Sequence, residues 1–161
     1  VLEGEDWRSR LRMWAIVQRQ MLDRHKWITE MPMAAPPMAP NSLSFVETGL
    51  SAMDGMAIDD QDKLRIIGLI SSYTLSEARM AHDAARAIKA QMETSGGANP
   101  AWTFDALLRE VVDEERYPRL YGIAWSEDGD EPPPSEEEEF LFGLERILDG
   151  ADSLVEKRKA Q

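Results

Sequence analysis

The chain has 161 residues, 43% of them hydrophobic, and its 30 acids and 18 bases give a net charge of −12. This length is enough to bury one sizeable core. The acidic balance excludes a basic surface that would neutralise phosphates, so we do not expect this chain itself to grip nucleic acid. No run of 18 apolar residues is present, which excludes a membrane span, and the absence of cysteine excludes disulfides and thiolate chemistry.

The start of the chain and its lack of cysteine bear on where the protein works. The chain opens Val-Leu-Glu-Gly-Glu-Asp, without the apolar region of a signal peptide. It starts at Val1 instead of Met, so we expect a piece of a longer protein. Together with the lack of cysteine, this favours a cytoplasmic protein. We expect residues 1–161 to form one domain.

Helical periodicity dominates the first part of the chain. Apolar positions step by three and four residues from Trp7 to His25, which predicts a helix with Asp6 as its N-cap. The arginines of this stretch mostly fall on other faces, where we expect them to reach water. Residues 31–40 hold four prolines and cannot form a regular helix. A shorter helix follows from Asn41 or Ser42 to near Gly55.

Helical periodicity continues through the second part of the chain. A helix of more than 30 residues is expected from Asp59 or Asp60 to the glycines at 96 and 97. Asn99-Pro100 opens another helix, and Tyr117-Pro118 breaks it before a short piece that ends around Trp125. The acidic and proline-rich residues 126–139 are expected to be solvated. A last helix follows, capped by Ser135 and Glu138, with Phe140, Leu144, Ile147, Ala151 and Leu154 on one face. The sequence therefore predicts an all-α fold, an antiparallel multi-helix bundle.

The residues give little support to an enzyme. The chain has two histidines, His25 and His82, and lacks the Glu-x-x-His pairs of di-iron bundles and the Gly-x-Ser-x-Gly elbow of serine hydrolases. We therefore predict no catalytic residues, no metal and no cofactor. A small helical enzyme would need a polar cluster around one of the histidines.

Polar residues on apolar helix faces are the candidates for ligand binding. Gln18 and His25 interrupt the apolar face of the first helix. In one interpretation both bond to the protein itself, or His25 only caps the helix end; in the other, Gln18 faces a pocket. The methionines near them suit either an irregular core or an adaptable cavity. If Glu47 or Glu77 is buried, it would favour a cationic or hydrogen-bond-donating ligand.

Two helices have wider apolar or small-residue faces than one neighbour would cover. In the last helix the Phe140 row is widened by Leu141, Leu148 and Val155. The 60–94 helix carries small residues that let another helix approach closely. Pairing both helices with a second copy would form a four-helix interface, which predicts a homodimer. The alternative is that both faces are used within one chain.

The order of several motifs resembles the effector-binding domains of TetR-family (tetracycline-repressor-like) transcription regulators. Trp7-Arg8 followed by His25-Lys26-Trp27 is similar to the Trp-Arg…His-Pro-Trp opening of that family, with Lys26 in place of the proline. Asn41-Ser42-Leu43 resembles the start of its next helix. Tyr117-Pro118-Arg119-Leu120 resembles its Tyr/Phe-Pro-x-Leu element. The segment FLFGLERILDG, residues 140–150, is very similar to its final-helix signature.

The resemblance implies a dimeric, ligand-sensing domain of a transcriptional regulator, in most cases a repressor. Its DNA-binding helix-turn-helix head would precede this sequence and is absent from it, and a small-molecule effector would bind in the helical core. We expect the effector site between the 6–25, 41–55 and 60–94 helices, lined by Trp14, Gln18, Met21, Phe45, Met53, Tyr73 and Glu77. The expected dimer interface comprises Ser71, Ala78, Ala85, Phe140, Leu144, Ile147, Leu148 and Ala151. The alternative is a purely structural dimerisation module with a filled core and no ligand.

Overall fold

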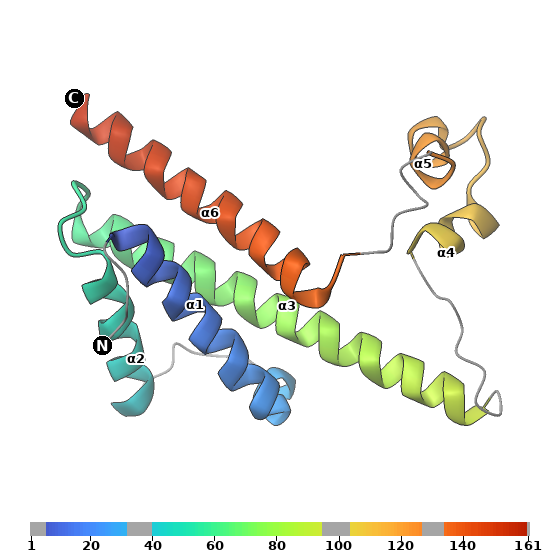
Figure 1. Ribbon diagram of the computed structural model, residues 1–161, viewed down its shortest axis with the longest axis horizontal. Helices are drawn as coiled ribbons and strands as arrows, with labels where there is room; N and C mark the ends of the chain where they lie inside the picture. The colour runs from blue at the N-terminus through green and yellow to red at the C-terminus, as the bar shows by residue number, and fades with distance from the viewer. Residues whose placement is uncertain (1–5, 32–39, 95–103, 127–133, 161) are drawn as a thin grey trace. The chain divides into compact units, whose positions relative to one another are not determined.

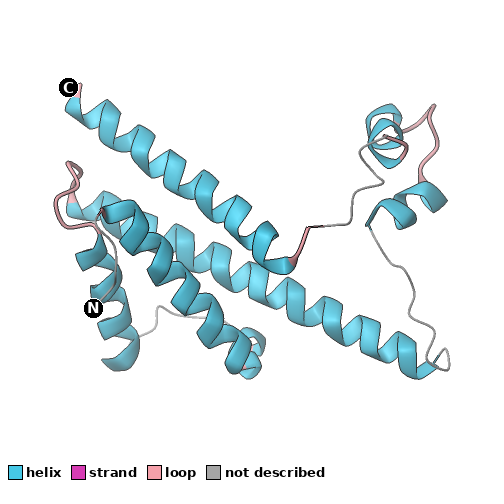
Figure 2. Cartoon of the chain, in the orientation of Figure 1, coloured by secondary structure: helices cyan, strands magenta, loops and turns pink. Residues whose placement is uncertain are grey.

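The structure is a computed structural model that describes residues 6–31, 40–94, 104–126 and 134–160. Within these ranges every regular element is helical and no strand occurs (Figure 2), which confirms the all-α prediction. The elements, labelled in Figure 1, are α1 (Trp7–Arg24), η1 (Lys26–Glu30), α2 (Pro40–Ala52), α3 (Asp60–Thr94), α4 (Phe104–Val111), α5 (Pro118–Ala124) and α6 (Glu136–Lys159).

Helix starts and ends follow the local signals in the sequence. The Asp6 carboxylate accepts a hydrogen bond from the Ser9 N–H at 2.7 Å, which confirms Asp6 as the N-cap of α1. Asp59 caps α3 in the same way, through the Asp62 N–H at 2.8 Å. Pro118 lies in the first turn of α5, where its missing N–H costs nothing. The end of the long helix was predicted at residues 96–97, and the start of the next helix at residues 99–100. Both positions lie outside the described residues.

The chain forms two compact units, residues 1–83 with 137–161, and residues 84–136. In the second unit, α4 and α5 pack on each other through the buried Leu108 and Ala124. Arg109 Nε donates to the Ala124 carbonyl at 2.5 Å, and the Tyr121 and Trp125 rings stack at 4.4 Å. Whether residues 1–161 act as one domain stays a prediction.

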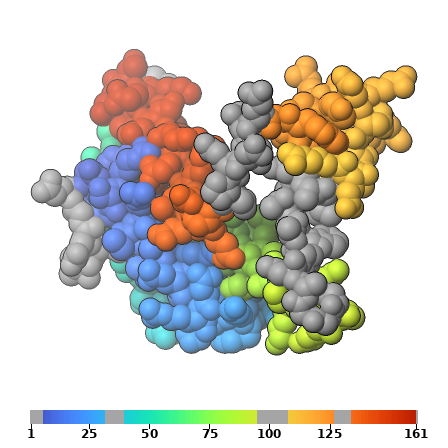
Figure 3. All heavy atoms as spheres, turned by 45° about the vertical axis from the view of Figure 1, so that its right-hand side comes forward, coloured from blue at the N-terminus to red at the C-terminus, as the bar shows by residue number. Residues whose placement is uncertain are grey.

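The first unit is built on antiparallel pairs of helices. Arg10 bonds to the Ala52 carbonyl and Trp14 to the Phe45 carbonyl, so α2 runs against α1. Helix α6 runs against α3 (Figure 1), because Tyr73 lies beside Phe140, and Asp62, near the start of α3, pairs with Arg158. In the space-filling view of Figure 3, the atoms of α6 lie directly against those of α1.

One continuous apolar core joins these four helices. Helix α6 buries Phe140, Leu144 and Ala151 of the predicted row, but Leu148 and Val155 are buried in place of Ile147 and Leu154, which are half-buried. The buried hydrophobic members are Leu11, Trp14, Ala15, Ala52, Met53, Met56, Ile66, Ile67, Ile70, Phe140, Leu144, Leu148, Ala151 and Val155. Burial of this set is the main stabilising contribution to the unit.

The buried face of α1 differs from the predicted one toward the helix end. Leu11 and Trp14 are buried as expected, but Met21 is 38% exposed and His25 is exposed. Arg19 and Leu22 are buried instead. The reason is that α6 covers the neighbouring side of α1, which moves the buried face around the helix.

Candidate functional site

The predicted effector residues begin with an aromatic pair between α1 and α2. The Trp14 and Phe45 rings stack with centroids 4.7 Å apart, and Trp14 Nε1 donates to the Phe45 carbonyl at 2.9 Å. Gly49 lets α2 approach closely: a Cβ at this position would lie 2.5 Å from Ile67 Cδ1 and 2.7 Å from Trp14 Cε2. A tight α1–α2–α3 contact therefore holds the Trp14 ring in a fixed place.

Gln18 lies one helical turn after Trp14 and carries an unsatisfied polar atom. Its side-chain oxygen Oε1 is buried and has no hydrogen-bond partner among the described residues. Such an unpaired buried acceptor costs about 1–3 kcal/mol, and most native structures avoid it. Gln18 is thus the predicted site residue whose bonding is incomplete. His25, which the sequence placed beside it, instead ends α1 at the surface.

Tyr73 belongs to a different contact, between α3 and α6. Its ring stacks on Phe140 at 5.7 Å, and its hydroxyl donates to the carbonyls of Phe140 at 3.0 Å and Glu139 at 3.2 Å. Burial, followed by the charge of Glu77, raises the pKa of the Tyr73 hydroxyl. Tyr73 therefore stays neutral and holds α3 against α6.

The remaining effector candidates differ in exposure. Met53 is fully buried in the core next to α2, Glu77 is half-buried on α3, and Met21 is 38% exposed on α1. The structure thus brings Trp14 and Phe45 into direct contact and places Met53 in the same core. Tyr73 instead contacts Phe140 and Glu139 of α6.

The predicted dimer residues are mostly buried within the single chain. Ser71 and Ile147 are half-buried and Ala85 is exposed, whereas Ala78, Phe140, Leu144, Leu148 and Ala151 are buried. Exposed apolar side chains lie on other rows of the same two helices. They include Leu69 and Met80 on α3, and Phe142 on α6, which is 65% exposed.

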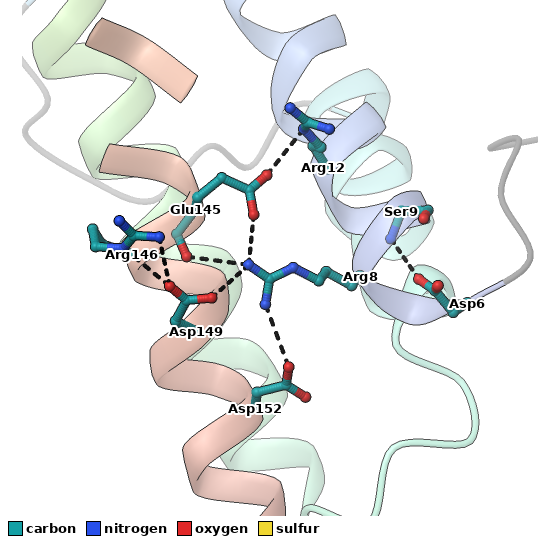
Figure 4. A network of polar contacts seen from close by, with 8 residues as sticks. All are labelled: Asp6, Arg8, Ser9, Arg12, Glu145, Arg146, Asp149 and Asp152. Atoms are coloured by element: carbon teal, nitrogen blue, oxygen red, sulfur yellow. Dashed lines mark hydrogen bonds and ion pairs between the residues drawn. The ribbon is translucent and has the colours of Figure 1, made fainter. Parts of the chain in front are cut away.

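Arg8, in the first turn of α1, reaches three carboxylates of α6 (Figure 4). Its Nη2 lies 2.5 Å from Glu145 Oε2 and 2.6 Å from Asp149 Oδ1, and its Nη1 lies 3.3 Å from Asp152 Oδ2. Arg12 pairs with the second oxygen of Glu145 at 3.0 Å. Five charged side chains, two on α1 and three on α6, therefore hold these helices together.

This cluster shifts the pKa values of Asp149 and Arg8. Hydrogen bonds from Arg8 and then from Arg146 lower the pKa of Asp149 below its ordinary value. Glu145, followed by Asp149, raises the pKa of Arg8 against the opposing effect of burial. The expectation that the arginines of α1 mostly reach water is therefore wrong for Arg8. Arg8 instead pairs with carboxylates of α6 that lie 137 or more residues away in the sequence.

A second ion pair fastens the other end of α6. Arg158 Nη2 lies 2.8 Å from Asp62 Oδ2, and Arg65 lies 2.8 Å from the other oxygen of the same carboxylate. The hydrogen bonds from Arg158 and Arg65, in that order, lower the pKa of Asp62. Asp62 is buried, so these two partners neutralise a charge that would otherwise be costly.

His82 forms a polar chain that the sequence analysis did not foresee. Its Nε2 lies 3.3 Å from Asp23 Oδ1 at the end of α1, and its Nδ1 lies 3.3 Å from the Thr29 hydroxyl of η1. Arg79 Nε adds a hydrogen bond to the Thr29 carbonyl at 2.7 Å. The buried imidazole thus holds η1 against α3, which is a structural role. The signal was available in the sequence, since His82 lies four residues after Ala78 on the buried face.

Within the described ranges, no group of three or more metal-ligating side chains is close enough to hold a metal ion. None of the helices there is long and apolar enough to cross a membrane.

Comparison with known proteins gives two matches. A family model described as "Tetracyclin repressor-like, C-terminal domain" matches residues 2–155. The chain is 27% identical over 158 residues to the HTH-type transcriptional repressor DrrR1 of Streptomyces coeruleorubidus. The match covers 96% of this chain but 55% of the relative, so the chain spans about half the length of that repressor.

Proposed function

We propose a function for this chain on the premise that it belongs to the tetracyclin repressor-like C-terminal domain family, whose model spans residues 2–155. The chain is the ligand-sensing and dimerisation domain of a TetR-like transcriptional regulator, most simply a repressor as its relative is named. The observation that carries this proposal is the family match over nearly the whole chain. In this function the domain binds and responds and has no catalytic role.

The effector site is proposed in the core between α1, α2 and α3. The stacked Trp14 and Phe45 rings make this region apolar, and the buried Gln18 oxygen provides an unused hydrogen-bond acceptor. Ligand sites commonly combine an apolar lining with a few polar groups. Met21, Met53, Tyr73 and Glu77 complete the proposed set.

Dimerisation is proposed through α3 and α6. Exposed Leu69, Met80 and Phe142 support it, because large apolar side chains on two long helices favour burial by a partner. Of the predicted interface residues, Ser71, Ile147 and Ala85 are accessible to a partner in one chain. The buried ones, such as Leu144, would support the interface from beneath.

Control of DNA binding would belong to a longer parent protein. A dimeric helix-turn-helix regulator must place its two recognition helices about 34 Å apart to read successive major grooves. An effector that binds more tightly to a different spacing lowers DNA affinity by linkage. A cytoplasmic location follows from this function.

Two alanine variants test the effector site. We expect Gln18→Ala and Tyr73→Ala to weaken binding of an effector found by screening, Gln18→Ala by removing an acceptor and Tyr73→Ala by loosening α3 from α6. Isothermal titration of the purified chain measures both affinities, with Gln20→Ala, an exposed position on α1, as the control. Unchanged affinity in both variants would remove these residues from the site.

Native mass spectrometry under gentle conditions tests the function as a whole. Dimers, and a small molecule released on activation, would support a ligand-sensing dimer. Dimers that bind no compound from a broad screen would favour the alternative, a structural dimerisation module. Monomers at all concentrations would contradict both.

A further inference from the structure

We propose that the effector is an uncharged, apolar molecule that donates an O–H or N–H hydrogen bond to Gln18 Oε1. This inference rests on the proposed function and names the class of ligand that the same site takes. It starts from the buried Gln18 oxygen, which has no partner among the described residues. A carbonyl oxygen only accepts hydrogen bonds, so the missing partner must be a donor.

Three side-chain donors of the core already have acceptors. Trp14, one turn before Gln18, donates its Nε1–H to the Phe45 carbonyl. The fully buried Thr74 hydroxyl donates to the Ile70 carbonyl at 2.8 Å, and the Tyr73 hydroxyl donates to the carbonyl of Phe140. Each of these carries a single O–H or N–H. Each of these donors bonds to a carbonyl, and none of them bonds to Gln18 Oε1, which leaves a bound molecule as the proposed source of the donor.

The charge of the surroundings favours a neutral donor. A cation in an apolar core needs a buried carboxylate as its partner. Glu47 is exposed and Glu77 is half-buried. Asp62, which is buried, is already paired with Arg158 and Arg65. One neutral acceptor, one helical turn after the Trp14 that stacks on Phe45, therefore fits a ring-bearing molecule with one hydroxyl or amide N–H.

The inference predicts opposite effects of one substitution on stability and on binding. Gln18→Met keeps the side-chain length and removes the unpaired acceptor. The ligand-free variant should therefore melt at a higher temperature than the wild type, because the cost of the buried oxygen is gone. Gln20→Met, at an exposed position on the same helix, is the matched control and should change the melting temperature little. If Gln18→Met does not fold, Gln18→Leu makes the same test.

The binding experiment compares two probes, 2-naphthol and 2-methoxynaphthalene. The first has a hydroxyl that can donate a hydrogen bond, and the second does not. Wild type should bind 2-naphthol roughly tenfold more tightly, a difference of about 1.4 kcal/mol. Gln18→Met should bind the two probes equally, whereas Gln20→Met should keep the preference. Isothermal titration measures all six affinities.

Three other results would contradict the donor inference or the proposed ligand class. Equal binding of both probes by the wild type, or a preference that survives Gln18→Met, overturns the donor inference while ligand binding stands. A melting temperature that is unchanged or lowered in Gln18→Met shows that the oxygen is satisfied in solution and also overturns it. If the wild type binds neither probe up to their solubility limits, the proposed ligand class is wrong. Only failure of the broad screen as well counts against the proposed function.

Discussion

At the scale of single residues, Gly49 shows how one missing side chain sets the distance between helices. It lies inside α2, where alanine would normally be more favourable by about 1 kcal/mol. Here an added Cβ would meet Ile67 and Trp14 at 2.5 and 2.7 Å, well inside ordinary contact distance. The glycine therefore lowers the helix propensity of α2 but lets α1, α2 and α3 approach closely.

We expect Gly49→Ala to destabilise the chain by about 1–2 kcal/mol, because overpacking a core outweighs the gain in helix propensity. Chemical denaturation followed by circular dichroism measures the free energy of unfolding. Gly150→Ala in α6 is the control: its Cβ would have nothing within 4 Å, so it should stabilise by about 0.5–1 kcal/mol. If both alanines stabilise, the close packing at Gly49 does not exist in solution.

At the scale of helices, local signals could be predicted and long-range polar partners could not. The Asp6 cap and the break at Pro118 depend on a few adjacent residues, so the sequence was sufficient. Periodicity predicted most of the buried row of α6, but Leu148 and Val155 are buried there in place of Ile147 and Leu154. Arg8, however, finds its carboxylates on a helix 137 or more residues away, and no local pattern specifies that pairing.

The candidate site was predictable to a similar extent. Periodicity placed Trp14 and Gln18 on one face of α1, and the structure keeps them there. The partner of each depends on how helices cross, so the direct contact with Phe45 and the unpaired Gln18 oxygen required the three-dimensional structure. Met21 is more exposed than expected for the same reason, because α6 covers a neighbouring side of α1.

The Arg8 cluster makes stability depend on pH. The pKa of Asp149 is lowered in the folded state, chiefly by Arg8, so its contribution is present above its unfolded pKa of about 3.9. That contribution is lost as pH falls through the lower folded pKa. Stability should therefore decrease below about pH 4, as the contribution of Asp149 is lost.

We expect Arg8→Met to lower the melting temperature at pH 7 by roughly 2–4 °C, the size of effect that a partly exposed ion-pair network has. The loss of stability between pH 4 and pH 2 should be shallower than in the wild type, because the pKa of Asp149 returns toward its ordinary value. Melting curves at pH 7, pH 4 and pH 2 measure both effects. Lys159→Met removes an equal charge from an exposed pair in the last turn of α6 and should leave the acid profile unchanged. An identical acid profile for Arg8→Met would show that Asp149 is not held by Arg8.

At the scale of the whole molecule, the apolar side chains of α6 that stabilise the fold differ from those available for dimerisation. Leu144 and Leu148 are fully buried in the core of one chain, so substituting them would unfold it. Phe142 lies on the same helix but is 65% exposed, with Arg146 over its ring at 5.4 Å. Assembly can therefore be tested at Phe142 without disturbing the core.

We expect Phe142→Asp to convert a dimer of this chain into a monomer, because a carboxylate on α6 would have to be buried without a partner in the proposed interface. The helix content should stay unchanged, since Phe142 contributes little to the core. Sedimentation velocity measures the mass, and circular dichroism measures the helix content. Met13→Asp, on an exposed position of α1 away from the proposed interface, is the control and should remain dimeric. A Phe142→Asp variant that sediments as a dimer would place the interface elsewhere. A wild type that is monomeric at high concentration would remove dimerisation from the function of this chain.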